Sequence, residues 1–123
     1  HDSTLTILEY PDNVKGHIFV SWLHPFKEHR LVVIGSEGML SFHDSSDEKP
    51  LKHYKKKFVL DGSLPIKIDG PMEDITYENK MPLTEELKYF IDHIEDKKPE
   101  ISNGEHALEV ITILNEASKQ LNE

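Results

Sequence analysis

Residues 21–42 read SWLHPFKEHRLVVIGSEGMLSF, and they decide how the first half of the chain folds. Proline has no N–H to donate to a ladder, so the polar segment that begins at Pro25 predicts a loop. Residues 30–34 (RLVVI) are β-branched and apolar and predict a strand. The sequence GSEG at residues 35–38 predicts a tight turn, with residues 39–42 as the returning strand. The stretch therefore predicts a loop followed by a β-hairpin.

The chain before this stretch predicts another hairpin. Residues 4–10 (TLTILEY) and 15–23 (KGHIFVSWL) have strand-like compositions, and PDN at residues 11–13 predicts the turn between them. Alternate residues of the second strand point to opposite sides. Each side carries apolar residues: Ile18, Val20 and Trp22 on one, and His17, Phe19, Ser21 and Leu23 on the other. We therefore expect this sheet to be covered on both faces.

The spacing of apolar residues changes along the second half. Residues 51–60 predict one or two short strands, residues 61–72 a mostly irregular segment, and residues 75–77 an edge strand. After Met81 the apolar period becomes about 3.6 and predicts a helix that ends at Lys97-Lys98-Pro99. Ser102 and Glu105 match a capping box, so Ser102 is predicted to cap a second helix over about 103–121.

Strands followed by two helices predict an α+β fold class. We expect an open, mostly antiparallel sheet with the two C-terminal helices packed on one face. A doubly wound parallel sheet would need alternating strands and helices. A length of 123 residues fits one domain of ordinary size, so residues 1–123 are predicted to form a single domain.

The charge balance limits the partners of the chain. Fourteen basic and 23 acidic residues give a net charge of −9, which repels phosphate backbones and anionic lipid. Neither nucleic acid nor a membrane surface is therefore expected as a partner. The chain has no cysteine, which removes disulfides, thiolate catalysis and cysteine-ligated zinc and suits a reducing cytoplasm.

The polar segment around Pro25 is the candidate site. His24 and His29 flank it, with Glu28 between them, but no helical histidine pair or HExxH pattern is present. We therefore expect a solvated turn between two strands and no metal site. The glycines of GSEG lie between two strands, so no dinucleotide fingerprint is present either. The residues alone complete no catalytic constellation.

These same residues resemble a known family. The stretch resembles the C-terminal domain of the glucose–fructose oxidoreductase, inositol dehydrogenase and rhizopine catabolism (Gfo/Idh/MocA) family. The residues that carry the resemblance are Ser21-Trp22, Pro25, Lys27, RLVVIG at residues 30–35 and GML at residues 38–40. The similarity is greatest to sugar-nucleotide dehydrogenases that oxidise the 3-position of UDP-N-acetylglucosamine or its uronic acid. Residues 81–121 are similar to the family's Pro-Leu-x-x-Glu-Leu helix, Lys-Pro stop and Gly-x-x-Ala-Leu-x-Val final helix. The resemblance extends over residues 5–121.

The resemblance implies an NAD(P)-dependent oxidoreductase of two domains that acts on a sugar or sugar nucleotide. An N-terminal Rossmann domain, absent from this sequence, would bind NAD or NADP and carry the catalytic lysine. The C-terminal domain would shape the sugar site and build a dimer or tetramer through its sheet, in the cytoplasm. The family's Asp-x-x-x-His pair would precede His1, and His1-Asp2 stand too late to take that role. No catalytic, cofactor-binding or metal residue carries over, and the chain alone is expected to be inactive.

Charge alone offers three residues for contacts with an anionic sugar nucleotide, namely His24, Lys27 and Arg30. A solvated turn is the alternative for these residues. For the whole chain, one alternative is a sheet-mediated oligomerisation module without substrate contacts. The other is a free-standing sugar-binding or metal-binding domain that uses His24 and His29.

Overall fold

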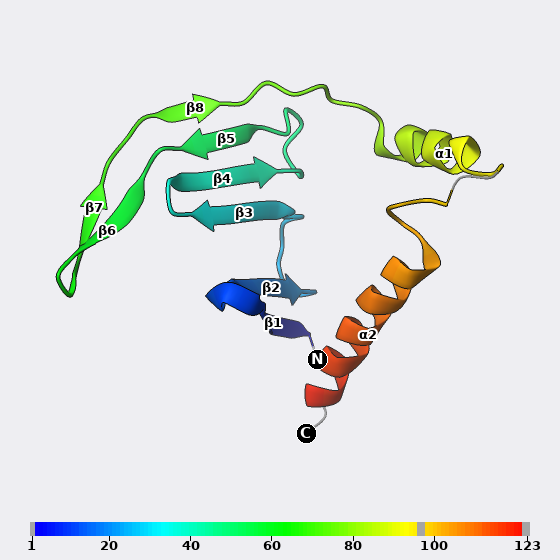
Figure 1. Ribbon diagram of the computed structural model, residues 1–123, viewed down its shortest axis with the longest axis horizontal. Helices are drawn as coiled ribbons and strands as arrows, with labels where there is room; N and C mark the ends of the chain where they lie inside the picture. Colours follow the sequence, from blue (N-terminus) through cyan, green and yellow to red (C-terminus); the bar gives the residue numbers. More distant parts are fainter. Residues whose placement is uncertain (1, 96–97, 122–123) are drawn as a thin grey trace. The chain divides into compact units, whose positions relative to one another are not determined.

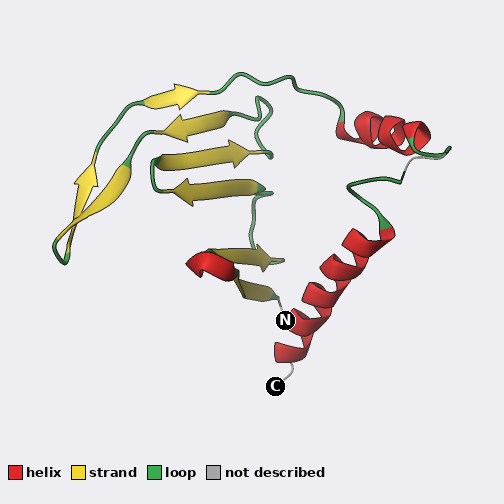
Figure 2. Ribbon diagram, in the orientation of Figure 1, coloured by secondary structure: helices red, strands yellow, loops and turns green. Residues whose placement is uncertain are grey.

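The computed structural model describes residues 2–95 and 98–121. Strands come first and helices last, as Figures 1 and 2 show. The strands are β1 (Ser3–Glu9), β2 (Lys15–Ser21), β3 (Arg30–Gly35), β4 (Gly38–His43), β5 (Leu51–Tyr54), β6 (Lys57–Asp61), β7 (Leu64–Ile68) and β8 (Met72–Asp74). The helices are α1 (Pro82–Asp92) and α2 (Gly104–Gln120), and a short 3-10 turn, η1 (Pro11–Asn13), joins β1 to β2.

The predicted α+β class is confirmed, with antiparallel pairing in every sheet. The sequence predicted one open sheet, whereas the described strands form three sheets, with the Pro25 segment between β2 and β3.

The chain divides into two compact units, His1–Trp22 with Asn79–Glu123, and Leu23–Glu78. No described residue is buried, and the apolar stripes of both helices are exposed. Packing of the helices on a sheet face therefore stays a prediction.

The first hairpin forms as predicted. β1 pairs with β2 from Ser3↔Ser21 to Glu9↔Lys15, and an ion pair of 2.9 Å joins the side chains of Glu9 and Lys15. Cross-strand partners in an antiparallel pair point to the same side. Leu5 and Phe19 are such partners, and Ile7 follows on the same face. This face carries the most exposed apolar side chains of the hairpin.

The unit of residues 23–78 contains a four-stranded sheet in the order β3-β4-β5-β8 (Figure 1). The predicted hairpin of residues 30–42 is confirmed as β3 and β4, whose turn closes at Gly35↔Gly38. Rows of apolar residues cross both faces of the sheet. Leu31, Phe42 and Leu51 form a row on one face, and Ile34, Met39, Tyr54 and Met72 form a row on the other. Tyr77 adds an edge-to-face ring contact of 6.0 Å to Phe42.

Two predictions in this unit were wrong. Residues 61–72 are not mostly irregular, because β7 pairs with β6 across a turn at Gly62, whose φ of 62° suits glycine. Pro65 is tolerated there because this two-stranded sheet has no central strand. The predicted edge strand at residues 75–77 instead lies at β8, three residues earlier, and the N–H of Ile75 donates to the carbonyl of Leu51 at 2.8 Å.

Both helices form, and α2 spans the predicted range, but α1 ends earlier than predicted. α1 ends at Asp92 because the N–H groups of His93 and Ile94 bond to carbonyls three residues back, which tightens the last turn. The predicted stop was Lys97-Lys98-Pro99, of which Lys97 lies outside the described residues and Lys98 and Pro99 are not helical. None of the helices in residues 2–95 and 98–121 is long and apolar enough to cross a membrane.

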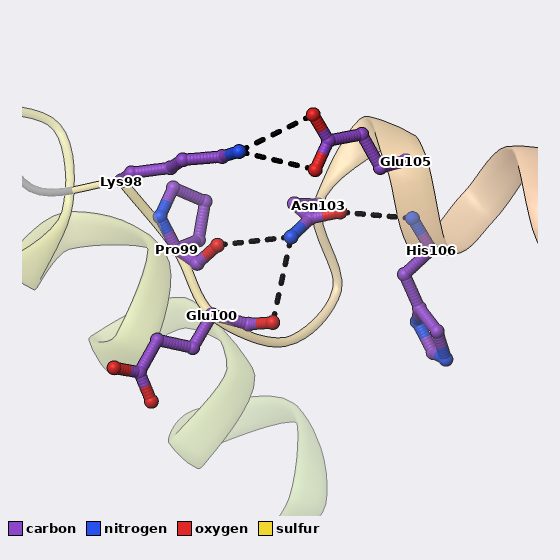
Figure 3. Close-up of polar contacts among 6 residues, drawn as sticks. All are labelled: Lys98, Pro99, Glu100, Asn103, Glu105 and His106. Atoms are coloured by element: carbon purple, nitrogen blue, oxygen red, sulfur yellow. Dashed lines mark hydrogen bonds and ion pairs between the residues drawn. The ribbon is translucent and has the colours of Figure 1, made fainter.

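The N-cap of α2 is Asn103, and the prediction of Ser102 was wrong. Asn103 Oδ1 accepts the N–H of His106 at 2.8 Å, and its amide donates to the carbonyls of Pro99 at 3.0 Å and Glu100 at 3.4 Å (Figure 3). Lys98 Nζ reaches both carboxylate oxygens of Glu105. Asn103 is the N-cap in place of Ser102 because its side chain both caps the helix and closes the preceding turn.

Replacing Asn103 should therefore weaken α2. We expect Asn103→Ala to lower the free energy of unfolding by about 1–2 kcal/mol, since the cap bond and two loop bonds are lost. Urea unfolding followed by helical circular dichroism measures the change. Ser102→Ala is the matched control and should leave the unfolding midpoint unchanged. An equal loss in both variants would contradict the assignment of the cap to Asn103.

Candidate functional site

The three predicted site residues lie together in the sequence and in the unit of residues 23–78. His24 and Lys27 belong to residues 23–29, which we call the Pro25 loop, and Arg30 is the first residue of β3. The loop folds back on itself at its start, where His24 Nδ1 lies 2.7 Å from the carbonyl oxygen of Phe26. The loop precedes β3, so it lies at the end of the β3–β4 hairpin opposite its turn.

Glu28 connects two of the predicted site residues. Its Oε2 lies 3.8 Å from Nε2 of His24, and its Oε1 lies 3.5 Å from Nε of Arg30. One carboxylate thus lies against both basic groups. Lys27 makes no ion pair with any residue that the structure describes. The structure therefore brings His24 and Arg30 to one carboxylate and leaves Lys27 apart from them.

The β4–β5 connection holds the end of the Pro25 loop. The N–H of His29 donates to Ser45 Oγ at 3.1 Å, and the N–H of Asp44 donates to the carbonyl of His29 at 2.9 Å. Nδ1 of His29 also lies 3.8 Å from Oδ2 of Asp44. Sequence reasoning missed these partners. Counting outward from the Gly35↔Gly38 turn would have found them, because that register places His29 opposite Asp44.

A second ion pair stabilises the same connection. Lys49 Nζ lies 2.9 Å from Oδ1 of Asp44, and Tyr77 donates its hydroxyl proton to the carbonyl of Lys49 at 2.6 Å. The hydrogen bond from Lys49 lowers the pKa of the Asp44 carboxyl below its ordinary value of 3.8, and the charges of Lys49 and His29 act in the same direction. The hydrogen bond to Asp44 raises the pKa of Lys49 above 10.5.

These shifts predict a pH window for the Asp44–Lys49 pair. The lowered pKa of Asp44 gives stability that is present above pH 3.8 and is lost as the pH falls through the folded value. The raised pKa of Lys49 gives stability that is present below pH 10.5 and is lost as the pH rises through its folded value. Comparing urea midpoints of wild type and Lys49→Gln across pH should show a small, constant difference between these limits. A difference that persists in strong acid would contradict the pairing.

The two histidines of the loop do not share a partner. His24 pairs with Glu28, and His29 pairs with Asp44. No group of three or more histidine, aspartate or glutamate side chains placed to hold a metal ion occurs in residues 2–95 and 98–121. The loop offers instead an exposed set of hydrogen-bond donors and acceptors on a hairpin end.

Comparisons with models of protein families, with curated proteins and with solved structures found no match to this chain.

Proposed function

We propose that this chain is the sugar-side and assembly domain of an NAD(P)-dependent oxidoreductase acting on a sugar or sugar nucleotide. The observation that carries the proposal lies in the stretch of the family resemblance, where His24 and Lys27 are exposed on the Pro25 loop and Arg30 is exposed at the start of β3. The end of the loop is tied to the adjacent connection through the backbone of His29. Sugars are bound by such convergent polar groups.

In the intact enzyme, hydride would pass from a sugar C–H bond to the nicotinamide, which a separate nucleotide-binding domain would hold. A lysine of that domain would take part in the proton transfer. The role of this chain is to orient the sugar ring through the Pro25 loop. UDP-N-acetylglucosamine, or its uronic acid, is the substrate class that the family resemblance favours.

A binding experiment tests this division of roles. We expect the chain to leave the fluorescence of NADH and NADPH unchanged, because the nucleotide would bind to the other domain. We also expect no turnover with any sugar in the presence of either cofactor. Clear micromolar binding of NADH to this chain would contradict the proposal.

A second function, self-association through the sheet, has its own supporting observation. Leu5, Ile7 and Phe19 form an exposed apolar face on the β1–β2 hairpin, and the four-stranded sheet carries apolar rows on both faces. Exposed apolar faces of this kind mark interaction surfaces. A sheet face that packs on its own copy forms a closed, symmetric dimer. The two functions are compatible in one domain.

A further inference from the structure

Glu28 engages two of the three candidate sugar-binding residues. The carboxylate uses one oxygen toward His24 and the other toward Arg30. The three side chains remain accessible to a ligand, with exposed fractions of 40% for His24, 44% for Glu28 and 57% for Arg30. Glu28 therefore stands where a carboxylate or phosphate of a ligand would have to bind.

Most cations near Glu28 already lie against a carboxylate. His29 and Lys49 face the carboxylate of Asp44, so they are engaged as well. Lys27 is the one cation of the Pro25 loop without an ion pair to a described residue. An anionic group at His24 and Arg30 must displace the Glu28 carboxylate or lie beside it. At 4 Å in water two like unit charges repel by about 1 kcal/mol, which is about a fivefold loss of affinity.

Uncharged sugar hydroxyls meet no such obstacle. A hydroxyl both donates and accepts, so neighbouring hydroxyls of a pyranose ring donate to the Glu28 carboxylate and to Nε2 of neutral His24, while the N–H groups of Arg30 donate to their oxygens. All three side chains keep their places in this arrangement. The charge-assisted bonds from hydroxyl to carboxylate also strengthen binding relative to neutral pairs.

We infer that Glu28 is a specificity-determining residue: it makes the Pro25 loop select an uncharged, hydroxyl-bearing sugar ring over a uronate carboxylate or a phosphate. This inference rests on the proposed sugar-side function and names the class of group that the loop contacts. A sugar nucleotide would then present its neutral ring to the loop, with its phosphates bound elsewhere.

The test compares two ligands that differ only at C6, methyl β-glucoside and methyl β-glucuronide. Each is titrated at millimolar concentration into the isotope-labelled full chain, and amide chemical shifts of the Pro25 loop report binding. The proteins are wild type, Glu28→Gln and the matched control Glu37→Gln. Glu37 is an exposed glutamate at the opposite end of the β3–β4 hairpin, paired with Lys57 at 2.8 Å. Its substitution removes the same charge without touching the loop.

Wild type and Glu37→Gln should both bind the glucoside more tightly than the glucuronide. Glu28→Gln should bind the glucuronide about fivefold more tightly than wild type does, and the glucoside more weakly, because the charge-assisted bonds to the carboxylate are lost. Equal affinities for the two ligands in wild type, or an unchanged glucuronide affinity in Glu28→Gln, would overturn the inference and leave the proposed function standing. A loop that responds to neither ligand in any protein would overturn both.

Discussion

Gly38→Ala should disrupt the four-stranded sheet. Gly38 has a φ of 156°, and a Cβ atom added there would lie 2.5 Å from the carbonyl oxygen of Tyr54 and 3.1 Å from Nε2 of His53. The backbone oxygen belongs to β5 and cannot move without opening the β4–β5 ladder. We expect a loss of about 3 kcal/mol or more in the free energy of unfolding.

Amide hydrogen exchange of β4 and β5 measures this effect strand by strand. Gly104→Ala is the matched control, because a Cβ at Gly104 meets no atom within 4 Å and alanine favours the helix that begins there. This control should keep wild-type protection in the sheet and stabilise α2 by up to about 1 kcal/mol. Wild-type exchange rates for β4 and β5 in Gly38→Ala would show that the close approach to Tyr54 is absent in solution.

Phe19→Ser should weaken self-association of the chain. Phe19 is 62% exposed and lies on the face of the β1–β2 hairpin that also carries Leu5 and Ile7. Burying a phenylalanine contributes about 1.5–3 kcal/mol, and a symmetric contact uses the residue twice. We expect the dissociation constant to rise by about tenfold or more.

Sedimentation equilibrium over a wide concentration range gives the dissociation constant directly. Ile18→Ser, on the opposite face of the same strand, is the control for lost apolar area and lost strand propensity. It should associate as wild type does. A wild-type chain that stays strictly monomeric at high micromolar concentration would contradict the assembly role. Equal weakening by both substitutions would contradict the assignment of the contact to the face that carries Phe19.

The sequence predicted the elements whose signals are local. Period-two spacing and the PDN and GSEG turns located the hairpins β1–β2 and β3–β4, and the change of period after Met81 located α1 and α2. The β6–β7 hairpin was missed because Gly62 and Pro65 are turn signals that a two-stranded sheet tolerates. The end of α1 was missed because its last turn tightens through backbone hydrogen bonds, which no residue type in the sequence predicts.

The candidate site was predicted by residue type but not by partner. His24, Lys27 and Arg30 were chosen for their charge, whereas their environment depends on Glu28. The tie between His29 and Asp44 joins residues fifteen apart and follows from the hairpin register, which composition does not reveal. Charge patterns therefore indicate which groups can bind a ligand, and cross-strand register decides which of them are already engaged.

The most direct test of the central claim is a titration of the labelled chain with UDP-N-acetylglucosamine. The proposed sugar-side role predicts that amide shifts concentrate in the Pro25 loop and at Arg30, and that they saturate at millimolar ligand. The turn at Gly62 should not respond. An undisturbed Pro25 loop at saturating ligand, or shifts confined to other segments, would contradict the claim that this loop contacts the sugar.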